Sequence, residues 1–214
     1  MTRTLFHPCC GPDILQSAQH FASAVDCIEA CDLWPGLPAY MEARLGFQRS
    51  SEAEHRFQIE PSDGTIHSAR NSPQFTPLGR GKVIEGSCRI AGSTIPRVRI
   101  HLHDAVEALN QVDQISVFFF RRDGPSEGEG SSGIPFLGST LFKRVLAKLS
   151  PDGLVVTDGA SMSGPASHDA LWTAPQEADP VGRTFESFGR RLRCIRVLST
   201  DRTPTLIWQS QSDS

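Results

Sequence analysis

The sequence lacks a strong net charge, and this absence narrows the classes of partner. Its 214 residues include 21 lysines and arginines against 24 aspartates and glutamates, which gives a formal net charge of −3. No basic field therefore extends over the chain to concentrate nucleic acid or anionic lipid. We expect a small-molecule substrate as the partner, with neither nucleic acid nor a membrane.

Long apolar runs are also missing. No stretch approaches the roughly 20 apolar residues that span a bilayer, and the N-terminus has no basic segment followed by a continuous apolar one. We therefore expect a cytoplasmic protein. The sequence indicates no oligomeric state.

The cysteines lack the paired spacing of zinc ribbons or of small disulfide frameworks. Two of them are adjacent at an expected strand end, where their side chains point to opposite sides and do not chelate one ion together. We expect reduced thiols that pack as small hydrophobic residues. The six are Cys9, Cys10, Cys27, Cys31, Cys88 and Cys194.

What the sequence does contain is an alternation of short apolar runs and helical periodicity. Strands are expected at residues 4–10, 25–30, 97–103, 115–120 and 154–157. Helices are expected at residues 12–25, 37–45, 106–109 and 136–149. This order predicts an α/β protein whose parallel sheet is covered by helices on both faces, in one domain over residues 1–214.

Two segments depart from this rhythm. Residues 48–93 are rich in serine, glycine, proline and single charges, so we interpret them as an insertion that contains a hairpin. Residues 192–198 and 205–208 are joined by a polar turn and are expected to form a closing antiparallel hairpin.

Two motifs follow the first two expected strands. "HPCCGPD" (residues 7–13) places a glycine turn after the first, and "IEACD" (residues 28–32) places an acid after the second. Gly11 and Asp32 are 21 residues apart, close to the roughly 20 of nucleotide-binding βαβ units. At such positions the glycine lets the backbone approach a cofactor and the acid accepts hydroxyl hydrogen bonds.

Two further motifs follow: "IHLHDA" at the end of the third strand, and "LAKLSPDGLVVTDG", which covers a helix, a turn and the fifth strand. Together the four motifs resemble those of the class I S-adenosylmethionine-dependent methyltransferases. The resemblance covers most of the chain outside residues 48–93. It implies a doubly wound, mostly parallel seven-stranded sheet with a C-terminal antiparallel hairpin. It also implies S-adenosylmethionine as the cofactor and methyl transfer to a small molecule.

The same resemblance assigns the candidate cofactor residues. Asp32 would accept hydrogen bonds from the ribose hydroxyls, Asp104 would meet the adenine, and Asp13 would face the methionine amino group. The set expected to bind the cofactor is Cys10, Gly11, Asp13, Asp32, Leu33, Asp104 and Ala105.

Candidate catalytic residues follow the fourth strand in "FFFRRDG". Methyl transfer is an in-line displacement, so the protein aligns a nucleophile and removes its proton where it has one. Asp123 is the candidate base, and Arg121 or Arg122 would hold an anionic substrate. The Asn-Pro-Pro-aromatic signature of enzymes that methylate nucleic-acid amino groups is missing here, which argues against bases as targets.

Other readings remain open. The family's turn carries two or three glycines and a preceding acid, whereas only Gly11 stands here, so a non-catalytic methyltransferase-like binding or assembly module is the alternative. A third is a metal-dependent hydrolase built on His101, His103 and Asp104. The arginines of the last hairpin are either a charged outer face or a local anion site. They are Arg190, Arg191, Arg193 and Arg196.

Overall fold

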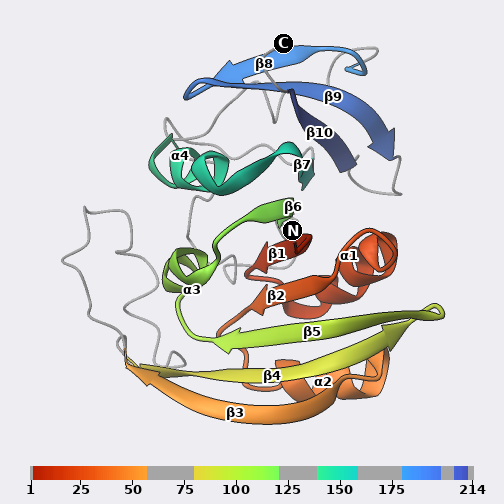
Figure 1. Cartoon of the computed structure of the whole chain (residues 1–214), viewed down its shortest axis with the longest axis vertical. Coiled ribbons are helices and arrows are strands. Elements are labelled where there is room, and N and C mark those ends of the chain that lie inside the picture. The colour runs from red at the N-terminus through yellow and green to blue at the C-terminus, as the bar shows by residue number, and fades with distance from the viewer. Residues whose placement is uncertain (1, 57–79, 121–138, 159–179, 199–204, 212–214) are drawn as a thin grey trace, which may run out of the picture. The chain divides into compact units, whose positions relative to one another are not determined.

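The computed structural model of the chain describes residues 2–56, 80–120, 139–158, 180–198 and 205–211. It divides into two compact units, Met1–Asp113 (unit 1) and Gln114–Ser214 (unit 2), and each is described by itself (Figure 1).

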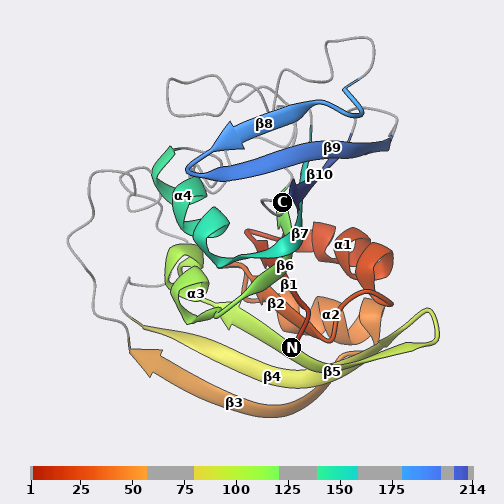
Figure 2. The same ribbon diagram turned by 45° about the horizontal axis from the view of Figure 1, so that its top comes forward.

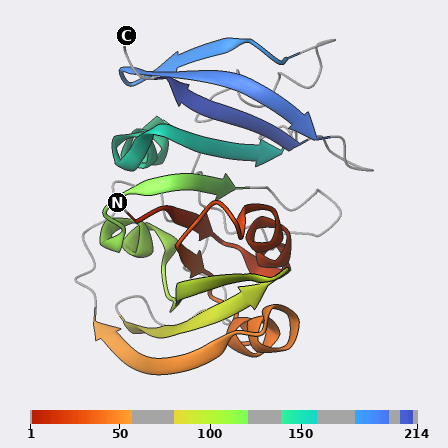
Figure 3. The same ribbon diagram turned by 45° about the vertical axis from the view of Figure 1, so that its right-hand side comes forward.

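Unit 1 is built around two short parallel strands. β1 (Thr4–Pro8) pairs with β2 (Cys27–Cys31), and β2 pairs with β5 (Ser93–Leu102), both in parallel. All five residues of β1 and all five of β2 are buried, as expected of strands that are covered on both faces. Figure 3 shows α1 (Ile14–Phe21) and α2 (Leu37–Leu45) on one side of these strands and α3 (Ala105–Gln111) on the other.

The outer edge of unit 1 is antiparallel. β3 (Gln48–Arg56) pairs with β4 (Arg80–Ile90), and β4 pairs with β5, so that the strand order of the unit is β3-β4-β5-β2-β1. The described parts of the expected insertion thus form two strands of the sheet.

The helix ends in unit 1 carry recognisable caps. Gly46 ends α2 in the left-handed conformation, and its amide donates to the Met41 carbonyl. Asp104 begins α3 as its N-cap, and its Oδ1 accepts from the amides of Val106 at 2.8 Å and Glu107 at 3.4 Å. A single-turn 3-10 helix, η1 (Gly11–Asp13), leads into α1.

Unit 2 has the strand order β6-β7-β10-β9-β8. β6 (Ile115–Phe120) and β7 (Leu149–Asp158) are parallel and are joined through α4 (Ser139–Lys148). β10 (Thr205–Gln211) is antiparallel to both β7 and β9 (Arg190–Leu198), as the expected closing hairpin requires. β8 (Thr184–Ser187) pairs with β9 at the edge, and Figure 2 shows this hairpin beside β10.

The prediction of seven strands in a mostly parallel sheet is wrong. The described residues contain ten strands, and antiparallel pairs join β3, β4 and β5 in unit 1 and β7, β10, β9 and β8 in unit 2. The fold class is α/β with mixed pairing. A hairpin was expected within residues 48–93, where β3 and β4 are antiparallel, but the position of β3 was not predicted. All its residues from 48 to 54 are exposed, so no buried face imposes the apolar alternation of a strand.

Among the helices that the described ranges contain, none is both long and apolar enough to cross a membrane.

Candidate functional site

The candidate site lies where the parallel strands of unit 1 end. The register pairs Pro8 with Cys31 and Cys31 with His101, so the carboxyl ends of β1, β2 and β5 meet at one edge of the sheet. In open α/β sheets this edge is where ligands bind. The turn after β1, Asp32 after β2 and Asp104 after β5 therefore come to the same edge.

The turn after β1 contacts Asp32 directly. The Gly11 amide donates to Asp32 Oδ2 at 2.7 Å, and the Cys10 amide donates to the Cys31 carbonyl at 3.0 Å. Gly11 has φ +43°, a left-handed conformation that favours glycine. Cys9 has φ +52°, which is uncommon for a residue with a side chain. The structure thus brings together the glycine and the acid that the sequence places 21 residues apart.

Asp32 is held from two more sides. Its Oδ1 accepts from the Trp34 amide at 2.8 Å, and its own amide donates to the His101 carbonyl at 3.0 Å. Each carboxylate oxygen has two lone pairs, so each can still accept a further hydrogen bond. A half-buried carboxylate in this state can take two adjacent hydroxyls of a ligand.

The remaining predicted cofactor residues have mixed surroundings. Cys10 is 2% exposed and Ala105 is 4% exposed, whereas Asp13 and Leu33 are half-buried near the same edge. Asp104 uses Oδ1 to cap α3. None of these positions conflicts with a role at the edge, and their role in cofactor binding stays a prediction.

The predicted catalytic residues Arg121, Arg122 and Asp123 lie outside the described residues.

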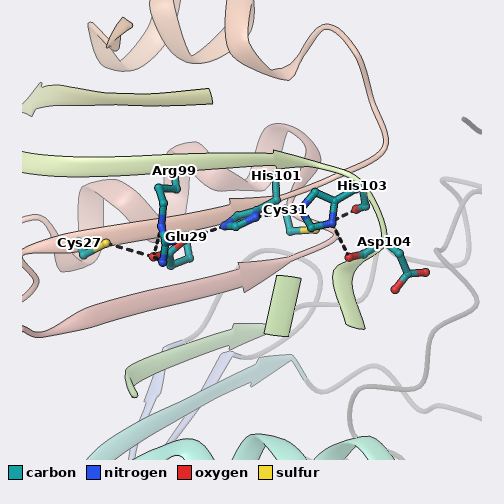
Figure 4. A network of polar contacts seen from close by, with 7 residues as sticks. All are labelled: Cys27, Glu29, Cys31, Arg99, His101, His103 and Asp104. Carbon is teal, nitrogen blue, oxygen red and sulfur yellow. Dashed lines mark hydrogen bonds and ion pairs between the residues drawn. The ribbon is translucent and has the colours of Figure 1, made fainter. Parts of the chain in front are cut away.

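A buried polar network that the motifs did not indicate runs below this edge, from β2 to the end of β5 (Figure 4). Glu29 is 2% exposed and accepts from Arg99 through Nε at 2.8 Å and through a second guanidinium nitrogen. Its other oxygen, Oε2, lies 2.7 Å from His101 Nε2. His101 Nδ1 lies 3.1 Å from His103 Nε2, and His103 Nδ1 lies 3.1 Å from the Asp104 carbonyl.

The direction of these hydrogen bonds follows from their last acceptor. A backbone carbonyl only accepts, so His103 carries its proton on Nδ1 and its Nε2 accepts from His101 Nδ1. An ionised Glu29 also only accepts, so it takes a second proton from His101 Nε2. His101 then donates from both ring nitrogens and is an imidazolium, paired with Glu29 in the interior.

The pKa shifts in the network fit this assignment. Burial, with the nearby charges of His101 and His55, lowers the pKa of His103 to about 4, so its ring is neutral near pH 7. Burial alone would raise the pKa of Glu29, but the hydrogen bonds and charges of His101 and Arg99 outweigh it and lower that pKa. Burial, with the neighbouring Glu29 carboxylate, raises the pKa of Cys27 to about 12.

Cys10 and Cys31 are packing residues in the described structure. Burial raises the pKa of Cys10 and of Cys31 well above its ordinary value, so both are thiols rather than thiolates near pH 7. The Cys31 thiol donates to the His103 carbonyl at 3.2 Å. All six cysteines are free of disulfides.

The hypothesis of a metal-dependent hydrolase is not supported by the described side chains. They include no group of three or more histidines, cysteines or acids able to hold an ion. His101 and His103 use facing nitrogens on each other, and Asp104 caps α3. Figure 4 shows the Asp104 carboxylate pointing away from both rings.

No protein-family model matches the sequence, and no curated protein matches it. Solved structures similar to the chain include Trm1 from Pyrococcus horikoshii with S-adenosyl-L-methionine, at 8% identity and TM-score 0.49, covering 99% of this chain and 51% of that one. This chain thus spans about half the length of that protein.

An rRNA methylase from Streptococcus thermophilus is similar at 8% identity and TM-score 0.43, over 99% of this chain and 89% of that one. Spermidine synthase from Thermotoga maritima is similar at 8% identity and TM-score 0.41, over 100% of this chain and 54% of that one. Because every one of these TM-scores is below 0.5, ligand and chemistry have to be read from this chain's own residues.

Proposed function

We propose that the edge of unit 1 formed by Gly11, Asp32 and Asp104 binds S-adenosylmethionine, and that the chain transfers its methyl group. The observation that carries the proposal is the 2.7 Å contact between the Gly11 amide and Asp32 Oδ2. It joins the tight turn after β1 to an acid at the end of β2, which is the arrangement that nucleotide-binding α/β folds use for a ribose.

Asp32 would accept hydrogen bonds from the two ribose hydroxyls, one on each carboxylate oxygen. Leu33 and Ala105 would border the adenine, with Asp104 beside it, and Asp13 would face the amino group of the methionine part. When bound, the cofactor would supply an electrophilic methyl group on a sulfonium. Asp123 remains the proposed base, with Arg121 and Arg122 as proposed substrate contacts.

The acceptor is proposed to be a small molecule, on the basis of the net charge of −3. Overall charge is the support for this part of the proposal.

Calorimetric titration with S-adenosylmethionine and with its demethylated product tests the cofactor. We expect binding in the micromolar range, and Asp32→Ala should weaken it about 10- to 100-fold, since hydrogen bonds to a charged acceptor contribute about 1.5–3 kcal/mol. Asp113→Ala is the matched control, because Asp113 is an exposed aspartate of the same unit that follows α3 and does not lie at the carboxyl ends of β1, β2 and β5. Far-ultraviolet circular dichroism of each variant shows whether it is folded.

A folded wild-type protein that gives no heat with either ligand would overturn the proposal and favour the binding or assembly module. One observation supports that second function. The turn after β1 holds a single glycine, Gly11, and no acid precedes it. Binding with no transfer to any acceptor would also support the module, with the cofactor as a structural ligand.

A further inference from the structure

The hairpin of β8 and β9 in unit 2 carries a net positive charge. Residues 184–198 contain four arginines and one glutamate, with no lysine and no aspartate, although the whole chain is slightly acidic. Charge at a binding surface is a local property, so the net charge of −3 does not describe this hairpin.

The structure separates these arginines into two groups. Arg190 is half-buried and donates to the Leu149 carbonyl on β7 at 3.1 Å, so it has a structural role. Arg191 and Arg193 lie on the opposite side of β9 from Leu192 and Cys194, which are both 0% exposed. Their side chains are exposed on the outer face of the sheet.

A β-bulge adds Arg196 to the same face. In a regular strand Arg196 would point inward with Leu192 and Cys194. The register with β10 changes between Ile207, which pairs with Arg196, and Trp208, which pairs with Cys194, so Ile195 is an extra residue on β9. Bulges re-aim side chains in this way. Arg191, Arg193 and Arg196 therefore share one exposed face, which we call the arginine face.

Little of this positive charge is compensated. Arg191 pairs with Glu186, which is the one acidic residue of the hairpin, and both side chains are more than half exposed. Arg193 and Arg196 have no ion-pair partner among the side chains that the structure describes. Gln209 and Gln211 of β10 lie opposite Arg193 and Arg191 in the register, so amide side chains border the face.

The turn of the hairpin presents an aromatic ring. Phe188 has φ +50° and Gly189 has φ +76°, a pair of left-handed residues that tight hairpins normally fill with asparagine or aspartate and glycine. A bulky residue in this conformation carries strain, and Phe188 is nevertheless 46% exposed. Exposed aromatic rings beside arginines stack on unpaired bases.

We propose that the arginine face, with Phe188 at its end, binds a single-stranded nucleic acid. A guanidinium group binds a phosphate with two parallel hydrogen bonds. A face whose positive charges are all arginines therefore favours a phosphate-bearing ligand. Arg191 and Arg193 are alternate residues of β9 and so lie about 6.8 Å apart along the strand. Arg196 follows them across the bulge, so the three arginines form a row in the direction of the strand. The exposed ring of Phe188 adds an apolar surface, which favours a ligand that has bases as well as negative charge.

This inference does not rest on the proposed cofactor site, because all of its residues belong to unit 2. It departs from the expectation that nucleic acid is not a partner, which was based on the net charge and on the missing Asn-Pro-Pro-aromatic signature.

Fluorescence anisotropy with labelled twelve-residue oligo(rU) and oligo(dT) tests the proposal on the full chain, from 50 to 200 mM salt. We expect binding of at least one oligonucleotide, with a slope of log affinity against log salt of about −2, since each single-strand phosphate contact contributes about −0.7. The variant R193Q/R196Q should lower affinity about tenfold or more and reduce the slope to about −0.7.

The matched control is R89Q/R97Q, which removes the same charge from exposed strand arginines of unit 1 and should leave binding unchanged. Glu186→Gln removes the carboxylate that competes for Arg191 and should strengthen binding. Phe188→Ala should weaken binding with no change in the salt slope.

Failure of both oligonucleotides to bind at 50 mM salt would overturn the proposal. So would equal weakening by the two double variants, which would mean that charge acts without a defined face. A twelve-residue polyglutamate that binds as tightly as the oligonucleotides would assign the face to an acidic protein instead. Titration of R193Q/R196Q with the demethylated cofactor product separates this test from that of the proposed function, since its affinity should be unaltered.

Discussion

Replacing Glu29 by glutamine should destabilise the protein far more than the loss of a surface charge would. Glutamine has nearly the same shape, so the change leaves packing intact and removes only the charge. It leaves the His101 imidazolium and Arg99 facing a neutral group in the interior, and the amide nitrogen must point toward one of these donors.

The expected magnitude follows from burial. Breaking a buried ion pair by removing one partner costs about 3–5 kcal/mol, because the other charge stays desolvated. Glu29 and His101 are 2% and 0% exposed, whereas Arg99 is 18% exposed and can turn partly to water. We therefore expect a loss in the free energy of unfolding near the lower end, about 3 kcal/mol.

Urea denaturation at pH 7, followed by circular dichroism, measures this loss. Glu52→Gln on β3 is the control, because Glu52 contacts both Lys82 and Arg49 but is a third exposed, and solvent screens its charge. The difference in the free energy of unfolding between the wild type and Glu29→Gln should shrink as the pH falls through the pKa of Glu29, because Glu29 then becomes neutral in the wild type as well. That pKa lies below its ordinary value. A Glu29→Gln variant as stable as Glu52→Gln would refute the assignment of a buried imidazolium and carboxylate pair.

Two further predictions concern the same edge of unit 1. The pKa of His103 falls from its ordinary 6.5 to about 4, so the unfolded chain binds the proton more readily. The neutral His103 ring should therefore contribute about 3 kcal/mol to the free energy of unfolding above pH 6.5, and this contribution should be lost as the pH falls toward 4. In His103→Gln the free energy of unfolding should depend less on pH over this range. Gly11→Ala should cost about 1–2 kcal/mol from left-handed strain, as should the control Gly92→Ala (φ +84°). Only Gly11→Ala should also weaken cofactor binding in calorimetry, so equal binding by both variants would contradict a role for the turn.

The central strands were predictable because burial on both faces leaves a plain signal in the sequence. The apolar run at residues 115–120 coincides with β6, and helical spacing at residues 37–45 coincides with α2. β8 was missed for the same kind of reason as β3, since only Ser187 of its four residues is buried and no apolar pattern marks it.

The buried network could not be predicted from motifs, because it depends on register. Glu29 and His101 are 72 residues apart, and their contact requires the pairing of Glu29 with Arg99 in the parallel β2 and β5 strands. A one-residue slip would turn these side chains to the opposite face. The signal that does exist is a glutamate inside an otherwise apolar strand, since a buried charge needs a partner. From the sequence, His101 and His103 were considered as metal ligands only in the third alternative, and Glu29 was given no role.

The single glycine of the turn is less of an obstacle to ligand binding than the sequence alone suggests. Glycine-rich turns make room for a cofactor, but they also leave a loop that binding must order, at a cost in conformational entropy. Here the turn is bonded to β2 through the Cys10 and Gly11 amides, and Asp32 is bonded to β5 through its own amide. Cys31 adds a thiol hydrogen bond to the His103 carbonyl. These contacts continue the pairing of the three strands past their ends. A ligand that binds at this edge therefore orders few further residues of the turn, and the loss of conformational entropy is small.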